Sequence, residues 1–191
     1  MSATCLEIIV RAMRRLGLLA AGETPQDSEA QDALGALQAR YLAWAADGMF
    51  RRLDQIVNGD EALQGAVYAP PAPDALVEVP VLLRDSETGR QVPPPDLALV
   101  EAVAAETAVR QLWLYDARRG GWVRLDGLKL DDEAPLSRRS PEGLAAVLAE
   151  EIADEFQGAL GAQTARLAGA FRWSISSRYG EARSTAGTDY F

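Results

Sequence analysis

The chain has 191 residues, of which 48% are hydrophobic and 25% are charged, as in a globular protein with one sizeable core. Its net charge of −9 disfavours nonspecific binding to the phosphate backbone of nucleic acid. The absence of histidine and the single cysteine exclude Ser-His-Asp and Cys-His catalysis, zinc sites built on histidine or paired cysteines, and an intrachain disulfide.

The N-terminal sequence MSATCLEIIVRAMRRLG contains a capping box, with Thr4 as N-cap and Glu7 three residues later. Apolar residues then recur at steps of three and four until Gly17, which predicts a helix over about residues 4–18. The stretch lacks the uninterrupted apolar region of a signal peptide. No apolar run in the chain approaches the roughly 18 residues of a membrane span, so we expect a soluble intracellular protein.

A second, longer helix is predicted from Thr24 and Pro25 to Gly48. Pro25 suits the first helical position, acidic residues fill the first turn, and glycine ends the helix. Its apolar stripe includes Tyr41 and Trp44, which we interpret as core residues. The first predicted helix is the expected antiparallel partner.

From Met49 to Pro95 the helical period fades and prolines accumulate, which excludes a long helix. Residues 76–83 have the composition of a strand, Pro80 would place it at a sheet edge, and SETG resembles a turn. A small hairpin and a structured surface loop remain equal alternatives. We treat residues 58–95 as an insertion.

Two further helices are expected. Asp96 would cap the third, which ends at Gly120 and Gly121, and Ser140 with Pro141 begins the fourth, which continues to about residue 169. Between them Asp131, Asp132 and Glu133 suggest a solvated bend rather than a cation site. Gly158 and Gly161 each weaken the fourth helix by about 1 kcal/mol. The prediction is an all-α four-helix bundle of two helical hairpins in residues 1–170.

The last 21 residues, 171–191, differ from this bundle. They carry three arginines against two acidic residues, a charge of +1 that leaves −10 for the remainder. From Phe171 to Tyr179, apolar side chains, with Ser177 among them, alternate with arginine and serine, a period of two that predicts an extended segment. Such a segment adds to a sheet edge or lies in a groove of a partner, where Tyr190 and Phe191 would be anchors. The alternative is a tail folded back on its own bundle.

The sequence EIIVRAMRRLGLLAAGETPQDSEAQDALGALQARYLAWAADGM has a short helix ending in LG, a GE-x-P entry and a W-x-x-x-G exit. It resembles the N-terminal helical hairpin of head-to-tail adaptor proteins, found in tailed bacteriophages and phage-derived gene transfer agents. The resemblance covers about the first fifty residues. It implies a helical protein that forms a ring of twelve subunits between the capsid portal and the next tail component, a stopper or tail terminator.

The resemblance further implies assembly in the bacterial cytoplasm, a final location at the head–tail interface, and passage of DNA through the lumen without specific binding. A negatively charged ring suits such a channel. No cofactor, metal or catalytic residue is implied. By this resemblance the C-terminal tail docks on the portal through Phe171, Arg172, Trp173, Ile175, Arg178, Tyr179, Tyr190 and Phe191.

Two other functions compete with the adaptor as explanations of the sequence. A carboxylate-based hydrolase acting on cell wall or nucleic acid would depend on acids such as Asp131 or Glu151, but their spacing supplies no acid and base pair. A helical DNA-binding regulator needs a basic recognition helix. The most basic helical stretch, residues 11–15, belongs to a helix whose apolar face is committed to packing.

Overall fold

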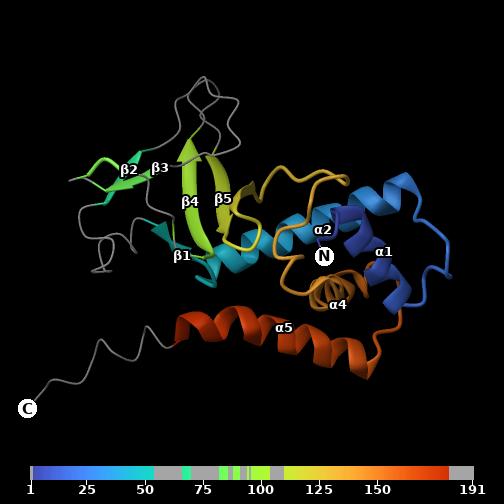
Figure 1. The fold of residues 1–191 in the computed structure, drawn as a ribbon. Coiled ribbons are helices and arrows are strands. Elements are labelled where there is room, and N and C mark those ends of the chain that lie inside the picture. Colours follow the sequence, from blue (N-terminus) through green and yellow to red (C-terminus); the bar gives the residue numbers. More distant parts are fainter. Residues whose placement is uncertain are drawn as a thin grey trace, which may run out of the picture. The chain divides into compact units, whose positions relative to one another are not determined.

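The computed structural model describes residues 2–53, 66–69, 82–85, 88–90, 94, 96–103 and 110–180. The chain divides into two compact units, one formed by Met1–Met49 with Leu128–Phe191 and the other by Phe50–Gly127. Within the described residues, four α-helices belong to the first unit and two β-sheets to the second (Figure 1). The expected all-α fold class is therefore wrong, because helices and sheet are both present.

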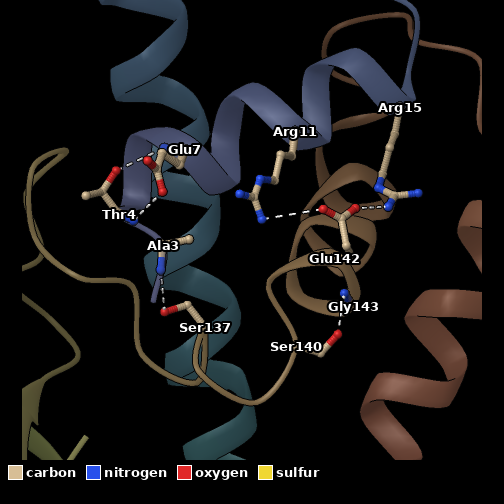
Figure 2. A network of polar contacts seen from close by, with 9 residues as sticks. All are labelled: Ala3, Thr4, Glu7, Arg11, Arg15, Ser137, Ser140, Glu142 and Gly143. Atoms are coloured by element: carbon tan, nitrogen blue, oxygen red, sulfur yellow. Dashed lines mark hydrogen bonds and ion pairs between the residues drawn. The ribbon is translucent and has the colours of Figure 1, made fainter. Parts of the chain in front are cut away.

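Helix α1 (Cys5–Arg15) begins at the predicted capping box. The Glu7 amide donates to the Thr4 hydroxyl at 3.2 Å, and the Thr4 amide donates to the Glu7 carboxylate at 3.2 Å (Figure 2). Gly17 adopts a φ of 74°, a left-handed conformation that glycine tolerates after a helix end. The first predicted helix is confirmed.

The residues before and within the first turn of α1 bond to the segment 130–137. The Ala3 amide donates to the buried Ser137 hydroxyl at 3.3 Å, and the Ala134 amide donates to the Ala3 carbonyl at 2.9 Å. The amides of Cys5 and Leu6, which have no partner inside the helix, donate to carbonyls of that segment. The start of the chain is thereby fixed to residues more than a hundred positions later.

Helix α2 (Asp27–Ala46) begins two residues after the predicted first position. Gln26 is the N-cap, and its amide donates to the Glu29 carboxylate at 2.9 Å. The predicted core assignment of Tyr41 and Trp44 is confirmed, since they are 0% and 1% exposed. The Tyr41 hydroxyl donates to the Pro135 carbonyl at 2.7 Å, which satisfies its one polar group.

The fourth predicted helix is two helices, α4 (Pro141–Ile152) and α5 (Ala162–Gly180). The predicted start is confirmed, because the Gly143 amide donates to the Ser140 hydroxyl at 3.0 Å and Pro141 occupies the first turn. The break lies at Gly158, where an added Cβ would stand 2.7 Å from the Leu16 side chain. Because the backbone at Gly158 passes this close to the end of α1, a side chain there would clash with Leu16. This close approach explains both the glycine and the interruption of the helix.

The larger sheet has the order β1-β4-β5-β6. Strands β4 (Ala98–Val103), β5 (Arg110–Asp116) and β6 (Gly121–Arg124) are antiparallel neighbours, and the two-residue β1 (Arg51–Arg52) runs parallel to β4. Leu99 is opposite Leu114, which is opposite Val123, and all three are buried. These cross-strand contacts form the apolar face of the sheet.

The predicted third helix is wrong, because its residues form β4 and β5. A nearly continuous apolar run fits a buried strand as well as a buried helix. Here Val100, Val103, Trp113 and Tyr115 are of strand-favouring types. The predicted helix end at Gly120 is instead the β5–β6 turn, where glycine has a φ of 78°.

The insertion expected at 58–95 falls partly outside the described residues. Strands β2 (Ala66–Ala69) and β3 (Leu82–Asp85) pair antiparallel. Of the strand predicted over 76–83, only Leu82 and Leu83 lie in the described part of the chain, and both belong to β3.

The contact between α4 and α5 generates a prediction about two glycines. A Cβ built at Gly143 would stand 2.7 Å from the Phe171 ring, whereas a Cβ at Gly169 meets nothing within 4 Å. We expect Gly143→Ala to lower the free energy of unfolding by about 1–3 kcal/mol through overpacking. Gly169→Ala, the matched control in a helix, should raise it by about 0.5–1 kcal/mol.

Denaturant unfolding followed by circular dichroism measures both variants. Equal stabilisation by the two alanines would contradict the close packing of Phe171 against α4.

Candidate interaction surface

The predicted docking tail does not begin as an extended segment. Helix α5 continues to Gly180, so residues 171–180 are helical and the period-two interpretation is wrong there. The buried residues of α5 follow steps of four, three and four: Thr164, Ala168, Phe171 and Ile175. This spacing is that of one face of a helix. The sequence already contained it, but the period-two alternation over residues 171–179 was taken as the stronger indication.

Phe171 and Ile175 belong to the core of the first unit, with exposed fractions of 4% and 1%. The Phe171 ring lies against Gly143 of α4 and 6.3 Å from the Trp44 ring of α2, measured between centroids. Trp44 in turn meets Tyr41 edge to face at 5.8 Å. These two predicted docking residues therefore anchor α5 to its own bundle and are not available to a partner.

Arg172 is half-buried and pairs with Glu150 of α4. Two serines of α5 donate to backbone carbonyls three residues earlier in the helix. The Ser174 hydroxyl donates to the Phe171 carbonyl at 2.7 Å, and the Ser176 hydroxyl donates to the Trp173 carbonyl at 3.2 Å. The arginine and serine side chains of 172–176 therefore serve the helix and its packing. They do not form the second face of a strand.

Trp173 is the predicted docking residue that the structure leaves open, with an exposed fraction of 71%. An indole buries about 150–250 Å² when a partner covers it, which makes an exposed tryptophan a strong candidate anchor. Of the remaining predicted residues, Arg178 and Tyr179 lie in the last turn of α5. Tyr190 and Phe191 lie outside the described residues.

The acidic residues of α4 form ion pairs with arginines of three neighbouring helices. Glu142 pairs with Arg11 at 3.4 Å and also with Arg15, both of α1 (Figure 2), and Glu151 pairs with Arg40 of α2. Glu150 takes Arg172 of α5, as described above. Glu150 and Glu151 therefore join α4 to two other helices. The arginines that reveal this are distant in sequence.

The acidic bend is also engaged in structural contacts. The Asp132 carboxylate accepts the Lys129 amide at 2.7 Å, and Glu133 pairs with Arg138, with one contact at 3.0 Å. In the part of the chain that the structure describes, no group of three or more aspartate, glutamate or cysteine residues is arranged to hold a metal ion. Glu151 pairs with Arg40 of α2, and Asp131 lies in a turn that precedes α4.

Comparison of the chain with models of known protein families and with curated proteins finds no match. None of the helices in residues 2–53 and 110–180 is long and apolar enough to cross a membrane. The functional interpretation therefore depends on the chemistry of the exposed side of α5 and on the resemblance of the N-terminal hairpin.

Removal of the Phe171 ring and removal of the Trp173 ring, both on α5, should have very different effects on stability. Phe171→Ala removes a buried ring and should lower the free energy of unfolding by about 3–5 kcal/mol. Trp173→Ala removes a mostly exposed ring and should change it by no more than about 0.5 kcal/mol. Thermal and denaturant unfolding of the two variants test this. A loss of several kcal/mol in Trp173→Ala would show that its ring is buried in solution.

The interhelical ion pairs generate a second prediction. Glu151→Gln breaks the pair with Arg40, whose side chains are 27% and 25% exposed respectively, and should cost about 1 kcal/mol or less. Glu155→Gln is the control, since Glu155 is exposed and forms no ion pair with a described residue. Salt titration of the unfolding transition should reduce the difference between the variants. A difference that persists in high salt would argue against an electrostatic origin.

Proposed function

We propose that this protein is a structural adaptor that joins the portal of a phage or gene transfer agent capsid to the next tail component. The observation that carries the proposal is the two-sided character of α5. Phe171 and Ile175 hold the helix on the bundle, while Trp173 points away from it. An anchored helix that leads into the final residues 181–191 supports a docking role for the C-terminal segment, with Tyr190 and Phe191 as its anchors.

The N-terminal hairpin supports the resemblance from which the proposal came. Helices α1 and α2 are contiguous in sequence, contact each other, and have a left-handed glycine after each helix, at Gly17 and Gly48. The LG pattern, residues 16–17, directly follows the last residue of α1, and the GE-x-P pattern, residues 22–25, directly precedes Gln26, the N-cap of α2. The antiparallel sheet of the second unit departs from a purely helical adaptor, and we assign it to contacts with the tail component or a neighbouring subunit.

The overall charge is compatible with this role. A ring built from chains of net charge −9 would repel DNA from its lumen and let it pass without adhesion. In this proposal the protein assembles in the bacterial cytoplasm and ends at the head–tail interface, as one of twelve ring subunits. It has no catalytic activity. The rival carboxylate hydrolase has less support, because Glu151 is committed to Arg40.

The decisive experiment is portal binding by a truncated chain. A deletion from residue 171 would remove Phe171 and Ile175 from the core, so the truncation should begin after Gly180. We expect the shortened protein to remain folded and to lose binding to the purified portal of the same particle by about thirtyfold or more, the loss typical of removing interface anchors. Co-sedimentation and electron microscopy measure binding and ring formation.

The double substitution Tyr190→Ser with Phe191→Ser tests the same anchors without shortening the chain. Circular dichroism controls for folding in both variants. Unchanged portal affinity in the folded, truncated protein would refute the docking role of the C-terminal segment.

A further inference from the structure

The segments 16–22 and 157–163 together form an exposed surface without charge, the uncharged patch. Their sequences are LGLLAAG and QGALGAQ, and neither contains a charged residue, although 25% of the chain is charged. Most of these residues are exposed. Leu18 and Leu160 are 37% and 42% exposed, and they are two of the three large apolar side chains left open in the described part of the chain.

Backbone contacts hold the two segments of the uncharged patch side by side. The Ala159 amide donates to the Leu16 carbonyl at 3.3 Å, and a Cβ added at Gly158 would stand 2.7 Å from the Leu16 side chain. Leu18 and Leu160 each lie within two residues of this hydrogen bond, which is at most about 8 Å of chain at 3.8 Å per residue. The connection between α4 and α5 passes the end of α1 (Figure 1). The two exposed leucines therefore belong to one region of the surface.

The loop that supplies half of the uncharged patch has a defined conformation. The Leu18 amide donates to the Met13 carbonyl at 3.0 Å, and the Ala20 amide donates to the Glu23 carboxylate at 2.7 Å. In the other half, a Cβ added at Gly161 would meet nothing within 4 Å, so the surface there is open. An ordered surface loses little conformational entropy on binding. Apolar residues exposed together without charges are typical of the centre of a protein interface.

One open positive charge borders the uncharged patch. Arg14, in the last turn of α1 and four residues before Leu18, is exposed. Its Nη2 atom donates to the Glu23 carbonyl at 3.2 Å, and it forms no ion pair with a described residue. The complementary surface is apolar and uncharged at its centre, with a carboxylate at the edge opposite Arg14. A nucleic acid offers no such surface, so the complement is a segment of a protein.

The uncharged patch and the C-terminal segment lie at opposite ends of α5. The helix begins at Ala162, inside the patch, and ends at Gly180, where residues 181–191 begin. It spans about 27 Å at 1.5 Å per residue. A protein that joins two components needs two surfaces that do not overlap, and this separation supplies them.

We propose that the uncharged patch binds the next tail component, through an apolar segment of that protein that places a carboxylate against Arg14. The inference rests on the proposed function and assigns the second of its two partner sites. The residues after Gly180 serve the portal, and the two short loops at the other end of α5 serve the tail.

The test measures binding of the full-length protein to the purified portal and, separately, to the purified next tail component of the same particle. Leu18→Ser with Leu160→Ser should weaken binding to the tail component by about tenfold or more, because two leucines can no longer be buried in the contact. Portal binding should not change. Leu18→Met with Leu160→Met is the matched control, since it keeps the surface apolar, and it should bind both partners like the unmodified protein. Circular dichroism checks that both variants are folded.

A second variant tests the charge at the edge of the patch and leaves both leucines in place. Arg14→Glu should weaken binding to the tail component and make the remaining affinity less sensitive to salt, because an attractive charge pair is lost. Arg166→Glu is its control, since Arg166 is also exposed and forms no ion pair with a described residue. The chain truncated after Gly180 should show the reverse pattern, with portal binding lost and binding to the tail component kept.

Two results would overturn the inference. One is unchanged affinity for the tail component in the folded variant with both leucines replaced by serine. The other is a loss of self-association in that variant, measured by sedimentation velocity without partners, because the patch would then bind a second copy. Failure of the proposed function looks different, since the unmodified protein would bind neither the portal nor the tail component.

Discussion

The first unit depends on the burial of α4. Almost every residue of this helix from Gly143 to Ile152 is inaccessible to solvent, because α4 contacts each of the other three described helices (Figure 1). A helix enclosed in this way requires small side chains where neighbours approach, and the sequence GLAAVLA supplies them. Its charges can lie only near the two ends, where each finds an arginine of a different helix. These pairs orient α1, α2 and α5 around a common centre.

The same constraint decides which residues of α5 can have a function. Its inward residues must fill the space left by Gly143, and Phe171 does so while closing an aromatic cluster with Trp44 and Tyr41. Only the opposite side remains for recognition. A rigid, well-packed helix presents Trp173 with little conformational entropy to lose on binding, which favours affinity. The buried anchor Phe171 and the exposed Trp173, the residue proposed for recognition, are therefore two positions apart in sequence.

Signals contained within a few residues could be predicted from the sequence, and signals that depend on distant contacts could not. The Thr4 capping box and the start of α4 at Ser140 are local and were predicted correctly. The interruption after α4 depends on Leu16, which no pattern near Gly158 reveals. Strands β4 and β5 were mistaken for a helix because their apolar runs are compatible with either a helix or a strand. The pairing between the two strands decides which of the two forms. At the candidate site, Trp173 was singled out, but its neighbours Phe171 and Ile175 were assigned outward instead of inward.

The bonds between the N-terminus and the segment 130–137 have a consequence for how the chain folds during synthesis. The Ala3 amide and the Ser137 hydroxyl are 134 positions apart, so α1 emerges from the ribosome long before its capping partners exist. Residues 50–127 emerge in between and contain every described strand of both sheets. The second unit can therefore fold while the first is incomplete. Nascent chains that stop before α4 leave the apolar sides of α1 and α2 uncovered, which makes them substrates for chaperones and proteases.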